Sequence, residues 1–181
     1  VVSTDDTEIA TVARAHGGDV PFMRPQELAR DSSETFAAIQ HTLEKIPGYD
    51  ILLLLQPTSP LRTGSDIDGT LEQLQRHAAP SCVSVVEPAK SPYWAYKVDD
   101  TNRLVPLLGE KLARLRRQEL PKSYVLNGAV YAARVDWLLR HKGFLGSETV
   151  PFIMPAERSM DIDTEFDLKL AAHCIQQTSV T

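Results

Sequence analysis

The sequence is poor in the features that mark several common protein classes. It has only two cysteines among 181 residues, which excludes a disulfide framework. It contains no apolar run near the ~20 residues that a membrane-spanning helix needs. The formal net charge of −5 gives no reason to expect binding to nucleic acid or to an anionic membrane. These absences predict one globular domain with neither nucleic acid nor membrane among its partners.

Short motifs for several chemistries are missing as well. No dinucleotide-binding glycine motif, Walker loop or nucleophile elbow occurs. The five histidines are dispersed without metal-ligand spacing, which argues against a zinc site. Cys82 and Cys174 occur in apolar or helical patterns and are typical of buried thiols in a reducing compartment. No signal peptide is visible, and the prediction is a cytoplasmic protein.

Apolar periodicity predicts an α/β fold. Short apolar runs at 51–55 and 81–87 are typical of strands covered on both faces, and helical patterns lie between them. Further strands are expected at 126–134 and 148–155. Thr164 with Asp167 three residues later predicts a capping box at the start of a last helix, whose apolar face would consist of Phe166, Leu170 and Ile175. This alternation with short links predicts a doubly wound, mostly parallel, Rossmann-like sheet with helices on both faces.

Residues 88–124 interrupt this alternation. The segment "SPYWAYKVDDTNRLVPL" alternates apolar and polar residues like a hairpin, and a cluster of cations follows it. We interpret 88–124 as an arm inserted into the domain, for dimerisation or substrate binding. Arg117 in this arm is a candidate for neutralising an anionic substrate, although adjacent arginines also suit a solvated face.

The segment "ERSMDIDTEFD" places Asp161 and Asp163 on either side of one isoleucine. In an extended segment both carboxylates would share a face, roughly 6–7 Å apart. Two such carboxylates suit Mg²⁺, which accepts one or two protein carboxylates together with phosphates and water. The alternative is a solvated loop whose acids cap the next helix, and these residues alone leave both readings open.

Two further polar segments are candidates for a binding site. The loop 56–62, "QPTSPLR", contains two prolines that would present Gln56 in a restricted conformation. Arg62 suits a carboxylate or phosphate, or else an ion pair with a nearby aspartate of the next helix. In "NGAVY", Asn127 and Tyr131 would share one strand face, and the alternative is a turn followed by a core tyrosine.

Taken together, five segments resemble the acylneuraminate cytidylyltransferases, also called CMP-sialic acid synthetases. They are "VSTDDTEIA", "RPQELARDSS", "LLQPTSPLR", "NGAVY" and "RSMDIDTEFDL". Each is weak alone, but they occur in order and extend over nearly all of the chain. The resemblance implies Mg²⁺-dependent transfer of CMP from CTP to the anomeric hydroxyl of a nine-carbon 2-keto acid sugar, a nonulosonic acid, with release of pyrophosphate.

The resemblance also implies roles for individual residues. Asp161 and Asp163 would hold Mg²⁺ and help to activate the sugar hydroxyl, and Ser3 and Asp5 would contact the nucleotide. The candidate substrate-binding residues are Gln56, Arg62, Arg117, Asn127, Tyr131 and Phe144. Arg117 suits the sugar carboxylate, and Phe144 matches an aromatic lid that the family supplies from the other subunit of a homodimer.

Two departures from the family keep alternatives open. The family begins with a strand and a phosphate-wrapping loop that this sequence does not contain, so residues 1–181 are expected to form a single nucleotidyltransferase-type domain without them. Trp94 replaces a lysine of some members, which favours a legionaminic- or pseudaminic-like acceptor. The alternative functions are a different sugar nucleotidyltransferase and a non-catalytic nucleotide- or sugar-binding module.

The missing phosphate loop generates an expectation about affinity. Backbone amides and lysines of such a loop normally bind the triphosphate, so residues 1–181 should bind CTP weakly and turn over poorly. Isothermal titration with CTP and Mg²⁺ should give tighter binding for a version extended upstream. Equal affinity of the two forms would contradict the expectation.

Overall fold

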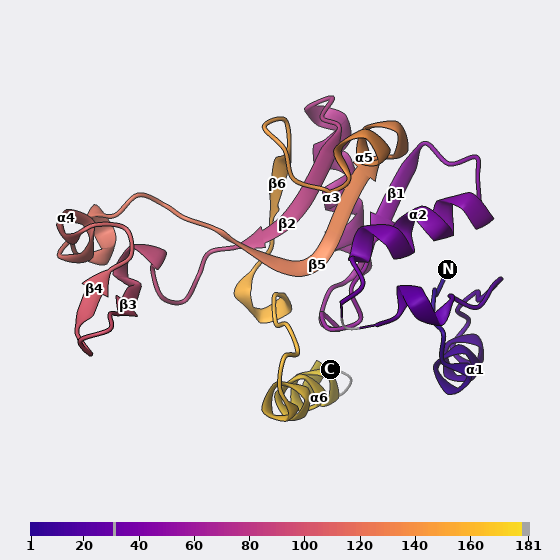
Figure 1. Cartoon of the computed structure of the whole chain (residues 1–181), viewed down its shortest axis with the longest axis horizontal. Helices are drawn as coiled ribbons and strands as arrows, with labels where there is room; N and C mark the ends of the chain where they lie inside the picture. Colours follow the sequence, from indigo (N-terminus) through magenta and orange to yellow (C-terminus); the bar gives the residue numbers. More distant parts are fainter. Residues whose placement is uncertain (31, 179–181) are drawn as a thin grey trace. The chain divides into compact units, whose positions relative to one another are not determined.

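The computed structural model describes residues 1–30 and 32–178. They form two compact units, which we describe separately (Figure 1). Unit 1 comprises Val1–Leu52 and Arg134–Gly143, and unit 2 comprises Leu53–Ala133 and Phe144–Thr181.

Unit 1 contains short helices joined by irregular chain. Its elements are α1 (Thr7–Ala15), η1 (Gln26–Leu28), α2 (Thr35–Lys45) and α5 (Val135–His141). The cap of α1 is Asp6, whose carboxylate accepts the amides of Glu8 and Ile9 at 2.7 and 3.0 Å. Ala10 is the buried residue of α1, whereas Ile9 and Val12 on the same helix are each 53% exposed.

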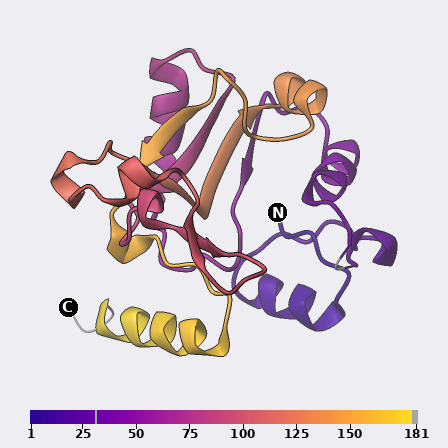
Figure 2. The same cartoon turned by 60° about the vertical axis from the view of Figure 1, so that its left-hand side comes forward.

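A mixed four-stranded sheet forms the main framework. Its strands are β1 (Ile51–Leu54), β2 (Ser81–Val86), β5 (Val125–Arg134) and β6 (Val150–Ile153), in the order β1-β5-β2-β6. Figures 1 and 2 both show β2 between β5 and β6. β2 runs parallel to β6 and antiparallel to β5. The predicted α/β class is confirmed, and β5 is the strand that runs against its neighbour.

Helix α3 (Gly64–Arg76) packs on β2 and β6. Its residue Gly69 lies against the ring of Phe152 in β6, since a Cβ there would stand 2.5 Å from the ring. Leu74 is completely buried on the same helix. Beneath it, Ala129, Val130 and Met154 form a buried cluster of unit 2.

The arm predicted at 88–124 contains the expected hairpin. Its elements are η2 (Pro92–Trp94), β3 (Tyr96–Val98), β4 (Leu104–Pro106), α4 (Glu110–Ala113) and η3 (Arg117–Glu119). β3 and β4 pair antiparallel, and the chain enters this segment after β2 and returns from it as β5 (Figure 2). The indole N–H of Trp94 donates to the carbonyl of Leu115 at 3.0 Å, so Trp94 joins parts of the arm.

The chain after β6 forms η4 (Ala156–Arg158) and then α6 (Glu165–Thr178). The predicted capping box of α6 is confirmed, because Asp167 accepts the amide of Thr164 at 2.8 Å. The predicted packing face of α6 is wrong, since Phe166 is 72% exposed. Among the described residues, no helix combines the length and apolar character needed to cross a membrane.

The burial of Leu74 leads to a prediction about stability. Leu74→Ala should lower the free energy of unfolding by about 2–5 kcal/mol, because it leaves a cavity between α3 and the sheet. Urea unfolding followed by circular dichroism would measure this. Leu168→Ala is the matched control, since Leu168 is 54% exposed and should change stability little. Equal effects of the two substitutions would contradict the packing described here.

Candidate active site

The candidate site is built on a bulge in β5. Val83 of β2 pairs with Tyr131 and Val85 pairs with Leu126, so residues 127–130 of β5 lie opposite Ser84 alone. Gly128 in this bulge has φ +70°, a conformation that glycine adopts without strain. The interpretation of Asn127 and Gly128 as a turn is wrong, because both lie within a strand.

The side chains of Ser84 and Asn127 bind the backbone groups that the bulge frees. Ser84 Oγ accepts the amide of Val130 at 2.8 Å and donates to Asn127 Oδ1 at 2.6 Å. Asn127 Oδ1 also accepts the amide of Ala129 at 3.2 Å. The side-chain nitrogen Nδ2 of Asn127 donates to Ser159 Oγ at 2.9 Å and to the sulfur of Met154 at 3.3 Å. All hydrogen-bonding positions of this buried amide are therefore used within the protein.

The proline loop that follows β1 docks on the same bulge. Ser59 Oγ donates to the carbonyl of Asn127 at 3.2 Å. Arg62 Nη1 donates to the carbonyls of Gln56, Ser59 and Ala129 at 2.6, 2.8 and 3.3 Å. Arg62 thus closes the loop on itself and fastens it to β5. The expected ion pair with an aspartate of α3 is wrong, and direct contact between Arg62 and substrate stays a prediction.

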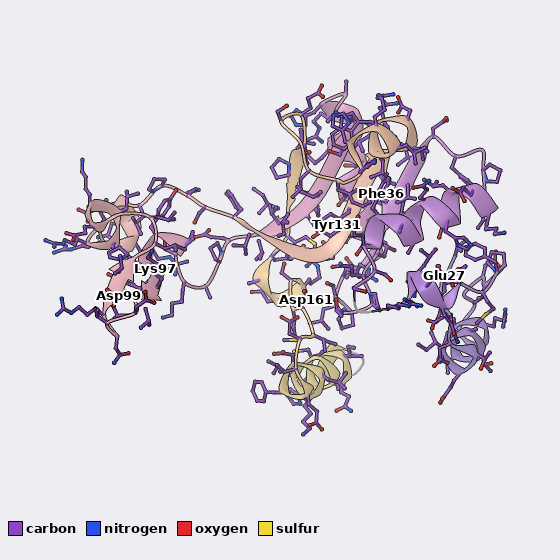
Figure 3. The ribbon with its side chains drawn as sticks, in the orientation of Figure 1. Glu27, Phe36, Lys97, Asp99, Tyr131 and Asp161 are labelled. Carbon is purple, nitrogen blue, oxygen red and sulfur yellow. The ribbon has the colours of Figure 1, made fainter. Side chains whose placement is uncertain are left out.

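Gly128 is the point where the proline loop meets the acidic segment, which is the chain between η4 and α6 that carries Asp161 and Asp163. A Cβ atom at Gly128 would stand 2.6 Å from Gln56 Oε1 and 3.4 Å from Asp161 Oδ2. The two chain segments are also joined directly, since the amide of Ile162 donates to the carbonyl of Thr58 at 2.8 Å. Figure 3 shows Asp161 on the segment between β6 and α6, with Tyr131 on β5. Gln56 and Asp161, two of the candidate site residues, therefore lie together at Gly128.

The segment that carries Asp161 and Asp163 is irregular, so the expectation that both side chains share a strand face does not apply. Both carboxylates are exposed, and within the described residues neither pairs with a lysine or arginine. No cluster of three or more metal-ligating side chains occurs in this part of the chain. Asp161 beside Gly128 and the exposed Asp163 two positions later fit a Mg²⁺ ion completed by phosphates and water.

Tyr131 and Phe144 form an aromatic pair beside Asp161. Their ring centroids are 5.4 Å apart with the planes at 53°. Burial raises the pKa of Tyr131, and the negative charge of Asp161 raises it further. Tyr131 therefore keeps its phenolic proton at neutral pH and is a hydrogen-bond donor. Phe144 contacts its own chain here, and its role toward a second subunit stays a prediction.

Arg117 lies at the base of the arm. Its Nη2 is 3.3 Å from Glu87 Oε1, and its guanidinium also donates to the carbonyls of Pro88 and Ala89. A small cleft next to this pair is lined by Lys122 as well. Exposed ion pairs contribute little to stability, so Arg117 can exchange Glu87 for another carboxylate at low cost.

The two expected nucleotide contacts belong to unit 1. Asp5 is exposed, whereas Ser3 Oγ is buried without a hydrogen-bond partner. Arg24 Nε is also buried and unpaired, and the amide of Arg24 donates to the carbonyl of Thr4 at 2.8 Å. Ser3 and Arg24 thus come from neighbouring segments and both have unused polar atoms. Arg24 is the first residue of the motif "RPQELARDSS", and the family resemblance assigned it no role.

The partly buried ion pair between Arg158 and Asp66 was not predicted from the sequence. Arg158 donates from Nε and Nη2 to the two oxygens of Asp66 at 2.9 and 2.8 Å, and Asp66 is 1% exposed. Burial opposes ionisation of Asp66, but hydrogen bonds from Arg158 and Thr63 outweigh it and hold its pKa below the ordinary value. The pair therefore stabilises the folded protein at pH values above the ordinary pKa of aspartate. This contribution is lost as the pH falls through the pKa that Asp66 has in the folded protein. Ninety-two positions separate the partners, so no sequence spacing could reveal them.

Comparison with known proteins decides the family. The family model described as "Cytidylyltransferase" matches residues 1–178. The chain belongs to the cytidylyltransferase family. Its members are nucleotidyltransferases, and this confirms the resemblance drawn from the five motifs.

Individual members of this cytidylyltransferase family show how far the similarity extends. The CMP-N,N'-diacetyllegionaminic acid synthase of Legionella pneumophila is 35% identical over 94% of this chain and 75% of its own length. The N-acylneuraminate cytidylyltransferase of Escherichia coli is 30% identical over 94% of this chain but only 40% of its own length.

A solved structure of CMP:2-keto-3-deoxy-manno-octonic acid synthetase complexed with CTP matches 98% of this chain and 80% of that chain. Its TM-score is 0.67 at 18% sequence identity, which confirms the Rossmann-like fold of this cytidylyltransferase.

The space around Gly128 leads to a prediction about the site. Gly128→Ala should disturb both the backbone and the site, because alanine is strained at φ +70° and its methyl group would displace Gln56. We expect about 1–2 kcal/mol of destabilisation from the backbone alone. Urea unfolding and a crystal structure of the variant would check it. Gly64→Ala at the start of α3 is the matched control, since a Cβ there meets open space.

Proposed function

We propose that this cytidylyltransferase transfers CMP from CTP to the anomeric hydroxyl of a nonulosonic acid and releases pyrophosphate. The observation that carries the proposal is the meeting of Asp161 and Gln56 over Gly128, at the bulge of β5. The names of the relatives described above support a nonulosonic acid as acceptor. A legionaminic-like sugar is favoured by the first of them and by Trp94.

Mg²⁺ is the proposed cofactor, held by Asp161 and Asp163. When bound, the ion would neutralise the developing charge on the phosphate oxygens. The two carboxylates are exposed and without cationic partners in the part of the chain that the structure describes, so neither must leave an ion pair first. Asp161 would in addition draw the proton from the sugar hydroxyl as that oxygen bonds to phosphorus.

The sugar would be bound by residues that surround the bulge and the arm base. Gln56 and the phenol of Tyr131 would hydrogen-bond sugar hydroxyls, and Phe144 would cover the apolar side of the ring. Arg117 would bind the sugar carboxylate in exchange for Glu87. Asn127, whose amide is saturated, would act by holding the bulge in shape.

Ser3, Asp5 and Arg24 are the proposed nucleotide-binding residues. Ser3 and Arg24 have buried polar atoms without protein partners, which supports hydrogen bonds to a polar ligand. Asp5, which is exposed just before α1, would contact the same ligand.

The protein would act as a cytoplasmic homodimer joined through the arm. Large apolar side chains are exposed along the arm, and they are Tyr96, Val98, Leu104, Leu107 and Leu108. Such a concentration on one segment suits an interface between protein subunits. Burial raises the pKa of Cys82 to about 11, so this thiol stays protonated and unreactive at neutral pH.

The test is product analysis with purified protein, Mg²⁺, and either CTP or UTP. We expect CMP-sugar and pyrophosphate from CTP with N-acetylneuraminate, legionaminic acid or pseudaminic acid, and far slower reaction with UTP. Turnover only with a sugar 1-phosphate would indicate a different nucleotidyltransferase. Ligand binding without any turnover would indicate a binding module.

The role of Asp161 is tested in the same assay. Asp161→Asn should lower kcat/KM at least about 100-fold, because it removes the charge that faces the reacting phosphate. Asp68→Asn is the matched control, since Asp68 is an exposed aspartate of α3 outside the site. Equal loss in both variants would reject the assignment of Asp161.

A further inference from the structure

The segment that carries Asp161 has no secondary structure of its own between η4 and α6. Among the described residues, bonds to Asp167 join it to α6, and three hydrogen-bonded attachments join it and the end of η4 to α3, β5 and the proline loop. Arg158 binds Asp66, Ser159 binds Asn127, and the amide of Ile162 binds the carbonyl of Thr58. Because no strand ladder or helix fixes this stretch, these attachments determine where the carboxylate of Asp161 stands.

The attachment through Arg158 differs from the other two. It is bidentate and charge-assisted, which makes it the strongest and most directional of the three. Its partner Asp66 is buried in the first turn of α3 and also accepts the amide and hydroxyl of Thr63. Thr63 directly follows the proline loop 56–62. The ion pair therefore joins the acidic segment to the end of the loop that presents Gln56.

Arg158 is also separable from the bulge. The attachment at Ser159 runs through Asn127, which supports β5 itself, and the attachment at Ile162 is made by the main chain. Arg158 makes no hydrogen bond to the residues of the bulge among those that the structure describes. Removing its side chain therefore loosens the acidic segment while leaving Gly128 and Asn127 in place.

We propose that Arg158 is a positioning residue for the metal site, which sets the place of Asp161 through its ion pair with Asp66. This inference rests on the proposed function for the identity of the metal ligands. Partners that orient a metal ligand from behind commonly change metal affinity about 10- to 100-fold when they are lost. Lysine cannot form the bidentate hydrogen bonds of arginine, so a lysine at position 158 should preserve only part of the metal affinity.

The experiment compares the whole chain with Arg158→Met, Arg158→Lys and Asp66→Asn. Mn²⁺ binding in the presence of CTP, followed by electron paramagnetic resonance, should weaken about 10- to 100-fold in Arg158→Met and less in Arg158→Lys. Hydrogen exchange at the amide of Ile162 should become faster in Arg158→Met, while exchange in β2 stays unchanged. Combining Arg158→Met with Asp66→Asn should weaken Mn²⁺ binding no further than either change alone.

Arg140→Met is the matched control, because Arg140 forms an exposed ion pair with Asp136 and lies in unit 1. It should leave Mn²⁺ binding and the exchange of Ile162 unchanged. Unchanged values in Arg158→Met would overturn the positioning role, and if that variant does not fold, Arg158→Lys decides by the same measurements. Neither measurement requires turnover. Absence of CMP transfer in the unaltered chain would therefore reject the proposed function without affecting the test of Arg158 as a positioning residue.

Discussion

The candidate site depends on one constraint, the need to satisfy the backbone of the bulge in β5. Residues 127–130 leave the regular ladder opposite Ser84, and a buried amide or carbonyl without a partner is costly. Ser84 and Asn127 supply partners from within the sheet, and Ser59 and Arg62 supply them from the proline loop. The loop is thus fixed by the same hydrogen bonds that stabilise the bulge, and Gln56 is placed as a consequence.

The acidic segment is attached to the same framework. Asn127 holds Ser159, Thr58 holds Ile162, and the ion pair with Asp66 reaches the start of α3. Gly128 leaves the space in which Gln56 and Asp161 approach each other. Asn127, which supports the bulge, and Tyr131, a proposed substrate-binding residue, therefore lie on the same strand, and the side chain of Asn127 is already fully hydrogen-bonded within the fold.

Local patterns predicted much of this architecture. The apolar runs that became β1 and β2, the hairpin of the arm and the capping box at Thr164 follow from periodicity and spacing, which are local properties. Contacts between distant positions could not be predicted in this way. The bulge depends on register against β2, and the exposure of Phe166 depends on tertiary packing that no helical pattern encodes.

The triple attachment of the acidic segment has a thermodynamic consequence. A flexible carboxylate loses conformational entropy when it binds a cation, and that loss weakens binding. Here the ordering of the main chain around Asp161 is completed during folding, so little entropy remains to be lost afterwards. Binding of the proposed Mg²⁺ ion by this segment should then be governed by dehydration of the cation and its carboxylates. Heating should weaken that binding mainly by breaking the three attachments.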